Sequence, residues 1–72
     1  MTITIKYNPK RAADRPFVLI DEQKRSDGTP YTTKREPLSA SRVMTLLARY
    51  EITVTDADLS DVADGNPLTI EK

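Results

Sequence analysis

Apolar side chains alternate with threonine or lysine over residues 2–7. A period of two is typical of a strand that buries one face, so this segment is predicted to be the first strand. Asn8-Pro9 ends it, because an Asn-Pro pair favours a turn. Residues 10–15 are then expected to form a polar loop or a single helical turn.

A second apolar segment begins directly after Pro16. In an extended chain Phe17 and Leu19 point to one side, whereas Val18 and Ile20 point to the other. Apolar residues on both faces are expected of a central strand. We therefore predict that this strand lies in the middle of the sheet.

Residues 26–29, Ser-Asp-Gly-Thr, predict a tight hairpin turn. Asp-Gly readily takes the two positive-φ positions of a type I′ turn, so a two-residue loop is expected. That register sets opposite charges and a cation–aromatic pair across the hairpin, each worth about 0.2–1 kcal/mol. Pro30 has no N–H, so the second strand of the hairpin is expected at a sheet edge or to begin with a bulge. The predicted cross-strand pairs are Lys24 with Tyr31, Asp21 with Lys34, Ile20 with Arg35 and Phe17 with Leu38.

Helical spacing appears after the hairpin. Val43, Leu46, Leu47 and Tyr50 repeat at i, i+3, i+4 and i+7, which is the apolar stripe of an amphipathic helix. Ser39 precedes them as a good N-cap residue. The pattern predicts a first helix that begins just after this serine.

A second, shorter helix is predicted over residues 56–64. Thr55 and Asp58 have the spacing of a capping box, and Gly65 follows as a stop signal. Residues 68–70 then alternate well enough to form a closing strand.

Together these elements predict one small α+β domain spanning residues 1–72. Its expected architecture is a small, mainly antiparallel sheet in β-β-β-α-α-β order, with two helices packed on one face. Leu, Ile, Val and Phe make up 16 of the 72 residues, just above the level of about 20% below which chains rarely fold. We therefore expect oligomerisation or partner binding to supply part of the stability.

The composition excludes several kinds of chemistry. The chain has no histidine and no cysteine, so it lacks the commonest general base, thiolate nucleophiles and the usual ligands of zinc and haem. We predict that it is not an enzyme and needs no cofactor. The longest apolar run covers only residues 17–20, and residues 1–7 do not resemble an export signal. Without cysteine, a cytoplasmic location is expected.

Charge is balanced overall but divided along the chain. The net charge is zero, which argues against bulk attraction to nucleic acid or anionic lipid. Residues 1–36 carry eight Lys and Arg against five Asp and Glu, whereas residues 37–72 carry three against six. The first half is therefore basic and the second half acidic.

The acidic residues of the second predicted helix suggest a cation site, because carboxylates bind hard cations. The spacing is wrong for an EF-hand, since a loop begun at Asp56 requires glycine at the position of Asp61. A DNA-reading role also fails, because phosphates would repel this helix. The simplest interpretation is that Asp56 and Asp58 complement the helix dipole and the rest are solvated. Otherwise Asp58, Asp61 and Asp64 form an acidic contact surface for a basic partner.

Cations of the first half fall in two predicted loops, the one at residues 10–15 and the hairpin tip. If the loops lie together, they form one patch for phosphates or for a protein partner, with Tyr7 or Tyr31 as a stacking face. Interleaved carboxylates favour an ordinary mixed-charge surface instead. The candidate partner-binding residues here are Lys10, Arg11, Arg15, Lys24, Arg25 and Tyr31.

By elimination, the sequence predicts non-catalytic binding of another protein, as a small inhibitor or adaptor-type regulator. Stand-alone chains this short often have such roles, including small proteins of phages and mobile elements, which is an analogy only. The alternative is a nucleic-acid-binding accessory protein that uses the basic loop and the hairpin. A homo-oligomer also stays open, and one hypothesis makes strand 2–7 an exposed edge that a partner or second copy extends.

Overall fold

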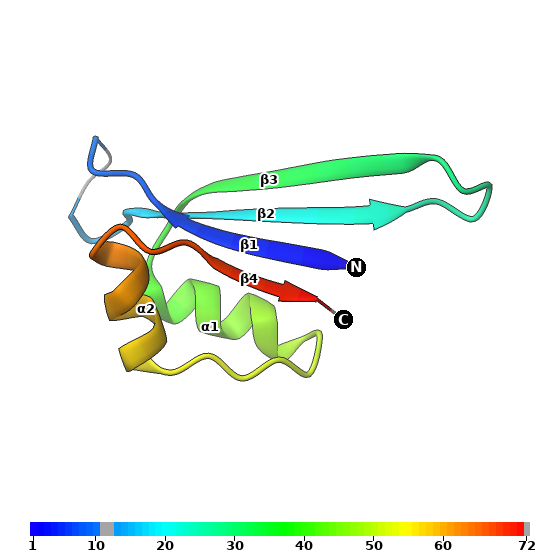
Figure 1. Ribbon diagram of the computed structural model, residues 1–72. Coiled ribbons are helices and arrows are strands. Elements are labelled where there is room, and N and C mark those ends of the chain that lie inside the picture. The colour runs from blue at the N-terminus through cyan, green and yellow to red at the C-terminus, as the bar shows by residue number, and fades with distance from the viewer. Residues whose placement is uncertain (11–12, 72) are drawn as a thin grey trace.

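The computed structural model describes residues 1–10 and 13–71 and confirms the small α+β fold (Figure 1). The strands form one four-stranded antiparallel sheet in the order β3-β2-β1-β4. Helices α1 and α2 both pack on one face of this sheet (Figure 1). The elements in chain order are β1 (Thr2–Tyr7), β2 (Phe17–Lys24), β3 (Pro30–Leu38), α1 (Ala40–Ala48), α2 (Asp56–Ala63) and β4 (Leu68–Glu71).

The core lies between the sheet and the two helices. Ile3 and Ile5 of β1 are completely buried there, together with Val43 and Leu47 of α1, and Val62 of α2 is nearly so. Burial of an aliphatic side chain of this size stabilises the fold by about 1.5–3 kcal/mol relative to exposure. The alternating and helical patterns therefore predicted the buried aliphatic residues, whereas Tyr7, on the same side of β1, is 38% exposed.

The two interior strands of the sheet are β2 and β1, and only β2 was predicted to be interior. The prediction that β2 is central is confirmed, because β3 and β1 flank it. Val18 is only 5% exposed although it lies on the face without helices. The hypothesis that β1 is an exposed edge is wrong, since β2 and β4 flank it on both sides. Ile3 and Ile5 pair with Ile70 and Leu68 of β4. The edge is thus covered by the far end of the chain, which the pattern of β1 alone does not reveal.

The loop of the β2–β3 hairpin has three residues, 26–28, and not the predicted two. The N–H of Gly28 donates to the carbonyl of Arg25 (2.8 Å), and the N–H of Arg25 donates to the carbonyl of Thr29 (2.9 Å). Of the loop residues only Gly28 has a positive φ, 89°, as in a type I turn followed by a bulge. Asp27 instead accepts the Thr29 N–H through its carboxylate (2.9 Å).

This loop shifts most of the hairpin by one residue from the predicted register, so the predicted ion pair and cation–aromatic pair are wrong. Lys34 lies on the opposite face from Asp21 and forms an ion pair with Glu36 instead (3.4 Å). Arg25, and not Lys24, lies over the Tyr31 ring, 5.5 Å from its centroid. The observed pairs are Lys24 with Pro30, Gln23 with Tyr31, Asp21 with Thr33, Ile20 with Lys34 and Leu19 with Arg35.

An irregularity in β3 restores the predicted pairing at the far end of the hairpin. Between Phe17 and Leu19 the register shifts by one residue, so Phe17 again faces Leu38 as predicted. Pro30 is the first residue of β3, and β3 lies at the edge of the sheet. This position was predicted from the missing N–H of Pro30.

The helix ends match the sequence signals. Ser39 caps α1 by accepting the N–H of Arg42 (3.2 Å). Thr55 and Asp58 form the predicted capping box of α2, with both reciprocal hydrogen bonds present (3.0 and 3.2 Å). Gly65 follows α2 with a φ of 101°, the left-handed conformation that ends many helices.

Substitution of Gly28 tests the hairpin loop. We expect Gly28→Ala to lower the free energy of unfolding by about 1–2 kcal/mol, because alanine is disfavoured at positive φ. Crowding does not contribute, since an added Cβ meets no atom within 4 Å. Gly28→Asn is the control and should cost less, because asparagine tolerates the left-handed region. Urea denaturation of the three proteins measures this, and equal stabilities would contradict the three-residue loop.

Candidate functional site

The β2–β3 hairpin projects beyond the rest of the sheet (Figure 1). Pairing of β1 with β2 ends at Thr2 and Glu22, whereas β2 pairs with β3 as far as Lys24 and Pro30. Residues 23–31 therefore extend past the start of β1, and we call them the hairpin arm. The arm contributes to the length of the molecule, which measures 39 Å along its longest axis.

A chain of hydrogen bonds fastens the base of the arm to the helix layer. The Tyr31 hydroxyl donates to Oε1 of Gln23 (3.0 Å), and Nε2 of Gln23 donates to Oδ2 of Asp21 (2.7 Å). The hydroxyl of Tyr50, just after α1, donates to the same Asp21 oxygen (3.3 Å). The arm is thus joined to the body by polar side chains as well as by the backbone ladder.

Asp21 is the buried centre of this chain. Its side chain is 5% exposed, and Oδ1 has no hydrogen-bond partner among the described residues. Burial of a carboxylate is costly unless donors stabilise it, so the two donors on Oδ2 offset part of that cost. Sequence reasoning missed this role because it placed Asp21 opposite Lys34. The available signal was that Asp21 and Gln23 continue the inward-facing side of β2 and therefore need polar partners.

The tip of the arm presents exposed charges. Lys24 and Arg25 are both exposed, and Arg25 lies over the face of the Tyr31 ring. Asp27 is the nearby anion, and the backbone and side chain of Thr29 donate to it, which holds the pKa of Asp27 below its ordinary value. Asp27 therefore stays ionised into the acidic range, and the tip offers two cations and one anion.

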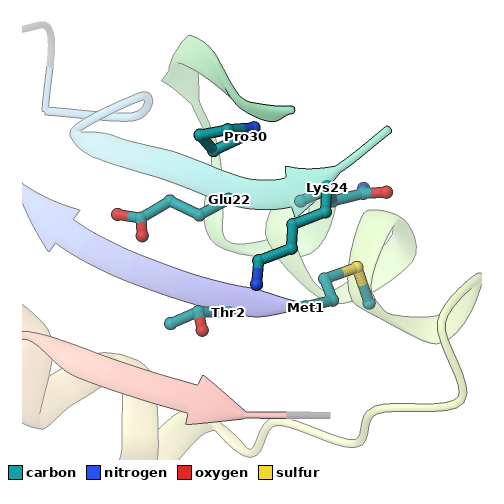
Figure 2. Close-up of a pocket in the computed structure, with 6 residues that line it drawn as sticks. Met1, Thr2, Glu22, Lys24 and Pro30 are labelled. Carbon is teal, nitrogen blue, oxygen red and sulfur yellow. The ribbon is translucent and has the colours of Figure 1, made fainter. Parts of the chain in front are cut away.

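A hollow of about 560 Å³ lies at the base of the arm, where β1 begins. Figure 2 shows Glu22 and Lys24 of β2 beside Thr2 and Met1 at the start of β1. The side chains of the lining contribute one carboxylate, of Glu22, and one ammonium group, of Lys24. This composition suits a mixed polar contact better than a site for phosphate or a metal ion.

The basic loop lies far from the arm. Lys10 and Arg15 are exposed in the β1–β2 connection, at the other end of β2 from Lys24 and Arg25 (Figure 1). Arg11 lies outside the described residues. At about 3.3 Å per residue, the eight residues of β2 separate the two groups by roughly 25 Å. Lys10 and Arg15 therefore do not form one patch with Lys24 and Arg25, which was one interpretation of the sequence, because successive connections of an antiparallel sheet lie at opposite ends.

The acidic residues of α2 lie toward the same end of the molecule as the basic loop (Figure 1). Asp58 is half-buried and its carboxylate is used in the capping box. Asp61 and Asp64 are exposed. Within residues 1–10 and 13–71, no group of three or more carboxylates is placed to hold a metal ion.

Comparison of the chain with protein-family models, with curated proteins and with solved structures found no match. No helix in the described part of the chain has the length and apolar character that crossing a membrane requires.

Removal of one hydroxyl tests the hydrogen-bond chain at the base of the arm. We expect Tyr50→Phe to lower the free energy of unfolding by about 1 kcal/mol, because Asp21 loses a donor. Tyr7→Phe is the matched control: Tyr7 is 38% exposed and contacts Phe17 through its ring, so its stability should change little. Chemical denaturation compares them, and equal effects of the two substitutions would contradict a fastening role for Tyr50.

Proposed function

We propose that the protein is a non-catalytic protein-binding module of the cytoplasm, a small inhibitor or adaptor-type regulator. Its hairpin arm contacts an acidic surface of another protein. The observation that carries this proposal is the position of Lys24 and Arg25, which are exposed at the tip of a hairpin that projects from the body (Figure 1). In this position a partner can reach both cations without disturbing the core.

The order of the arm supports a binding role. Arg25 is held against Tyr31, and Tyr31 is held by Gln23. Arginine and tyrosine are enriched among the residues that contribute most to protein interfaces. A side chain that is ordered before binding loses less conformational entropy when the complex forms.

The cations at the tip of the arm support an acidic partner. Cations at an exposed tip attract a surface of opposite charge and speed the encounter, while Asp27 limits which surfaces fit. The basic loop and α2 have weaker support as contact surfaces. Asp58 is already used in capping α2, and the loop is on the far side of the molecule from the arm.

Nucleic acid binding by the same residues has less support. The two basic groups lie at opposite ends of β2, so they do not follow one phosphate backbone as a single patch. Tyr7 and Tyr31 pair with Phe17 and Gln23 and therefore share the helix-facing side of the sheet. The open face of the described strands presents no aromatic side chain on which a base could stack.

Charge reversal at the tip tests the proposal. A protein partner captured from a lysate of the natural source, treated with nuclease, is purified and its affinity measured by calorimetry. We expect Lys24→Glu combined with Arg25→Glu to weaken binding by about tenfold or more, because each tip cation forms an interface ion pair worth about 1 kcal/mol. Lys10→Glu combined with Arg15→Glu makes the same charge change at the other end of β2 and should leave the affinity unchanged.

Two outcomes would overturn this proposal. In the first, charge reversal at the tip leaves the affinity unchanged, whereas charge reversal of Asp61 and Asp64, or of Lys10 and Arg15, lowers it. The contact surface would then be α2 or the basic loop. Recovery of nucleic acid alone, with affinity that falls steeply as salt rises, would establish the nucleic-acid-binding role.

A further inference from the structure

One edge of the sheet has an unpaired backbone. β3 is the outermost strand beside β2, and in residues 1–10 and 13–71 no strand lies on its other side. The N–H of Arg25 donates to the carbonyl of Thr29, and hydrogen-bonded pairs alternate along an antiparallel ladder. Tyr31, Thr33 and Arg35 therefore bond inward to β2. The N–H and C=O groups of Thr32 and Lys34 point outward, away from the sheet.

This edge is longer than the other one. β3 has nine residues, whereas the edge strand β4 has four. Pro30 and Pro37 have no N–H and limit the usable edge of β3 to the residues between them. Its outward groups at Thr32 and Lys34 can accept one further strand of about six residues.

We propose that this edge binds a second copy of the chain, with the two β3 strands antiparallel about a two-fold axis at Thr33. In this register Thr32 of each copy exchanges backbone hydrogen bonds with Lys34 of the other. No like charges lie directly opposite, and Thr33 faces Thr33. The proposal does not depend on the proposed function, because it uses the backbone of β3 and not the cations of the tip.

The neighbouring two-fold registers are less favourable. An axis at Lys34 sets two lysines directly opposite, and an axis at Arg35 sets two arginines opposite, which is destabilising. An axis at Thr32 pairs Lys34 with Pro30, which has no N–H to donate. The Thr33 register instead places Tyr31 opposite Arg35 of the other copy, on the helix-facing side, where a cation–aromatic contact is favourable.

The one anion of each tip, Asp27, lies toward cations of the other copy. The Thr33 register carries the tip of each copy to the connection between β3 and α1 of the other, with Asp27 beside Ser39. A hollow of about 320 Å³ lies at this connection, lined by Arg15, Pro37, Leu38, Ser39 and Arg42. Asp27 therefore approaches two arginines at each end of the pair. The net charge of zero adds no repulsion between copies.

A charged edge can also be a device against pairing, since lysine on an edge strand discourages added strands. The mass of the full chain in solution shows whether this edge pairs with a second copy or prevents pairing. We expect sedimentation from micromolar to millimolar concentration to show a dimer that dissociates on dilution. Thr32→Pro removes an outward N–H and should reduce the mass to that of one chain, 8.1 kDa, with the circular dichroism spectrum unchanged. Thr32→Val keeps the N–H and should remain a dimer.

A cross-link gives a second, independent measurement. The chain has no cysteine, so Thr33→Cys supplies a single thiol on the two-fold axis. Non-hydrogen-bonded antiparallel pairs have Cα atoms about 4.5 Å apart, which a disulfide can bridge. Under mild oxidation Thr33→Cys should form a disulfide dimer faster than Thr69→Cys, on the exposed part of β4. A monomer at all concentrations, or equal cross-linking of the two variants, would overturn the proposal whether or not Thr32→Pro folds.

Discussion

The conformation of Gly28 determines the orientation of the β3 side chains from Pro30 to Arg35. Its positive φ closes a three-residue loop and sets the register of β2 against β3. The faces of β2 are already fixed by its pairing with β1, so a shift of one residue would turn over this part of β3. Lys34 would then lie under the helices beside Asp21. The observed register keeps Lys34 on the open face and brings Tyr31 to Gln23.

The apolar core and the exposed cations of the hairpin lie in two different parts of this small domain. The body buries its apolar residues between the sheet and the helices, with Ile3, Ile5 and Leu47 at the centre. The hairpin arm adds little to that core and is held by hydrogen bonds that run from Tyr31 and Gln23 through Asp21 to Tyr50. A chain of 72 residues has little apolar surface to bury. Placing the exposed cations on a projecting hairpin leaves that core intact.

The arm and the free edge of β3 belong to the same hairpin, so the two proposals are related in space. A pair of copies joined along β3 would direct the two tips in opposite directions, because the strands are antiparallel. Such a pair would offer two equal contact sites and could bind a repeated or dimeric partner more tightly than a single copy does. The hydrogen bonds that join the copies would involve the backbone of Thr32 and Lys34 and would not use the side chains of Lys24 and Arg25.

The elements and their ends could be predicted from the sequence because their causes are local. Ser39, Thr55 and Asp58 cap helices through contacts three residues away, and the alternation over residues 2–7 reports one buried face. Only the tertiary structure decided which strands are neighbours, where the basic loop lies relative to the arm, and that Asp21 is buried beside Tyr50. Backbone hydrogen bonds between strands are nearly independent of side-chain identity. The pairing of β1 with β4 and the register of β3 therefore follow from how the whole chain packs and from one glycine dihedral angle.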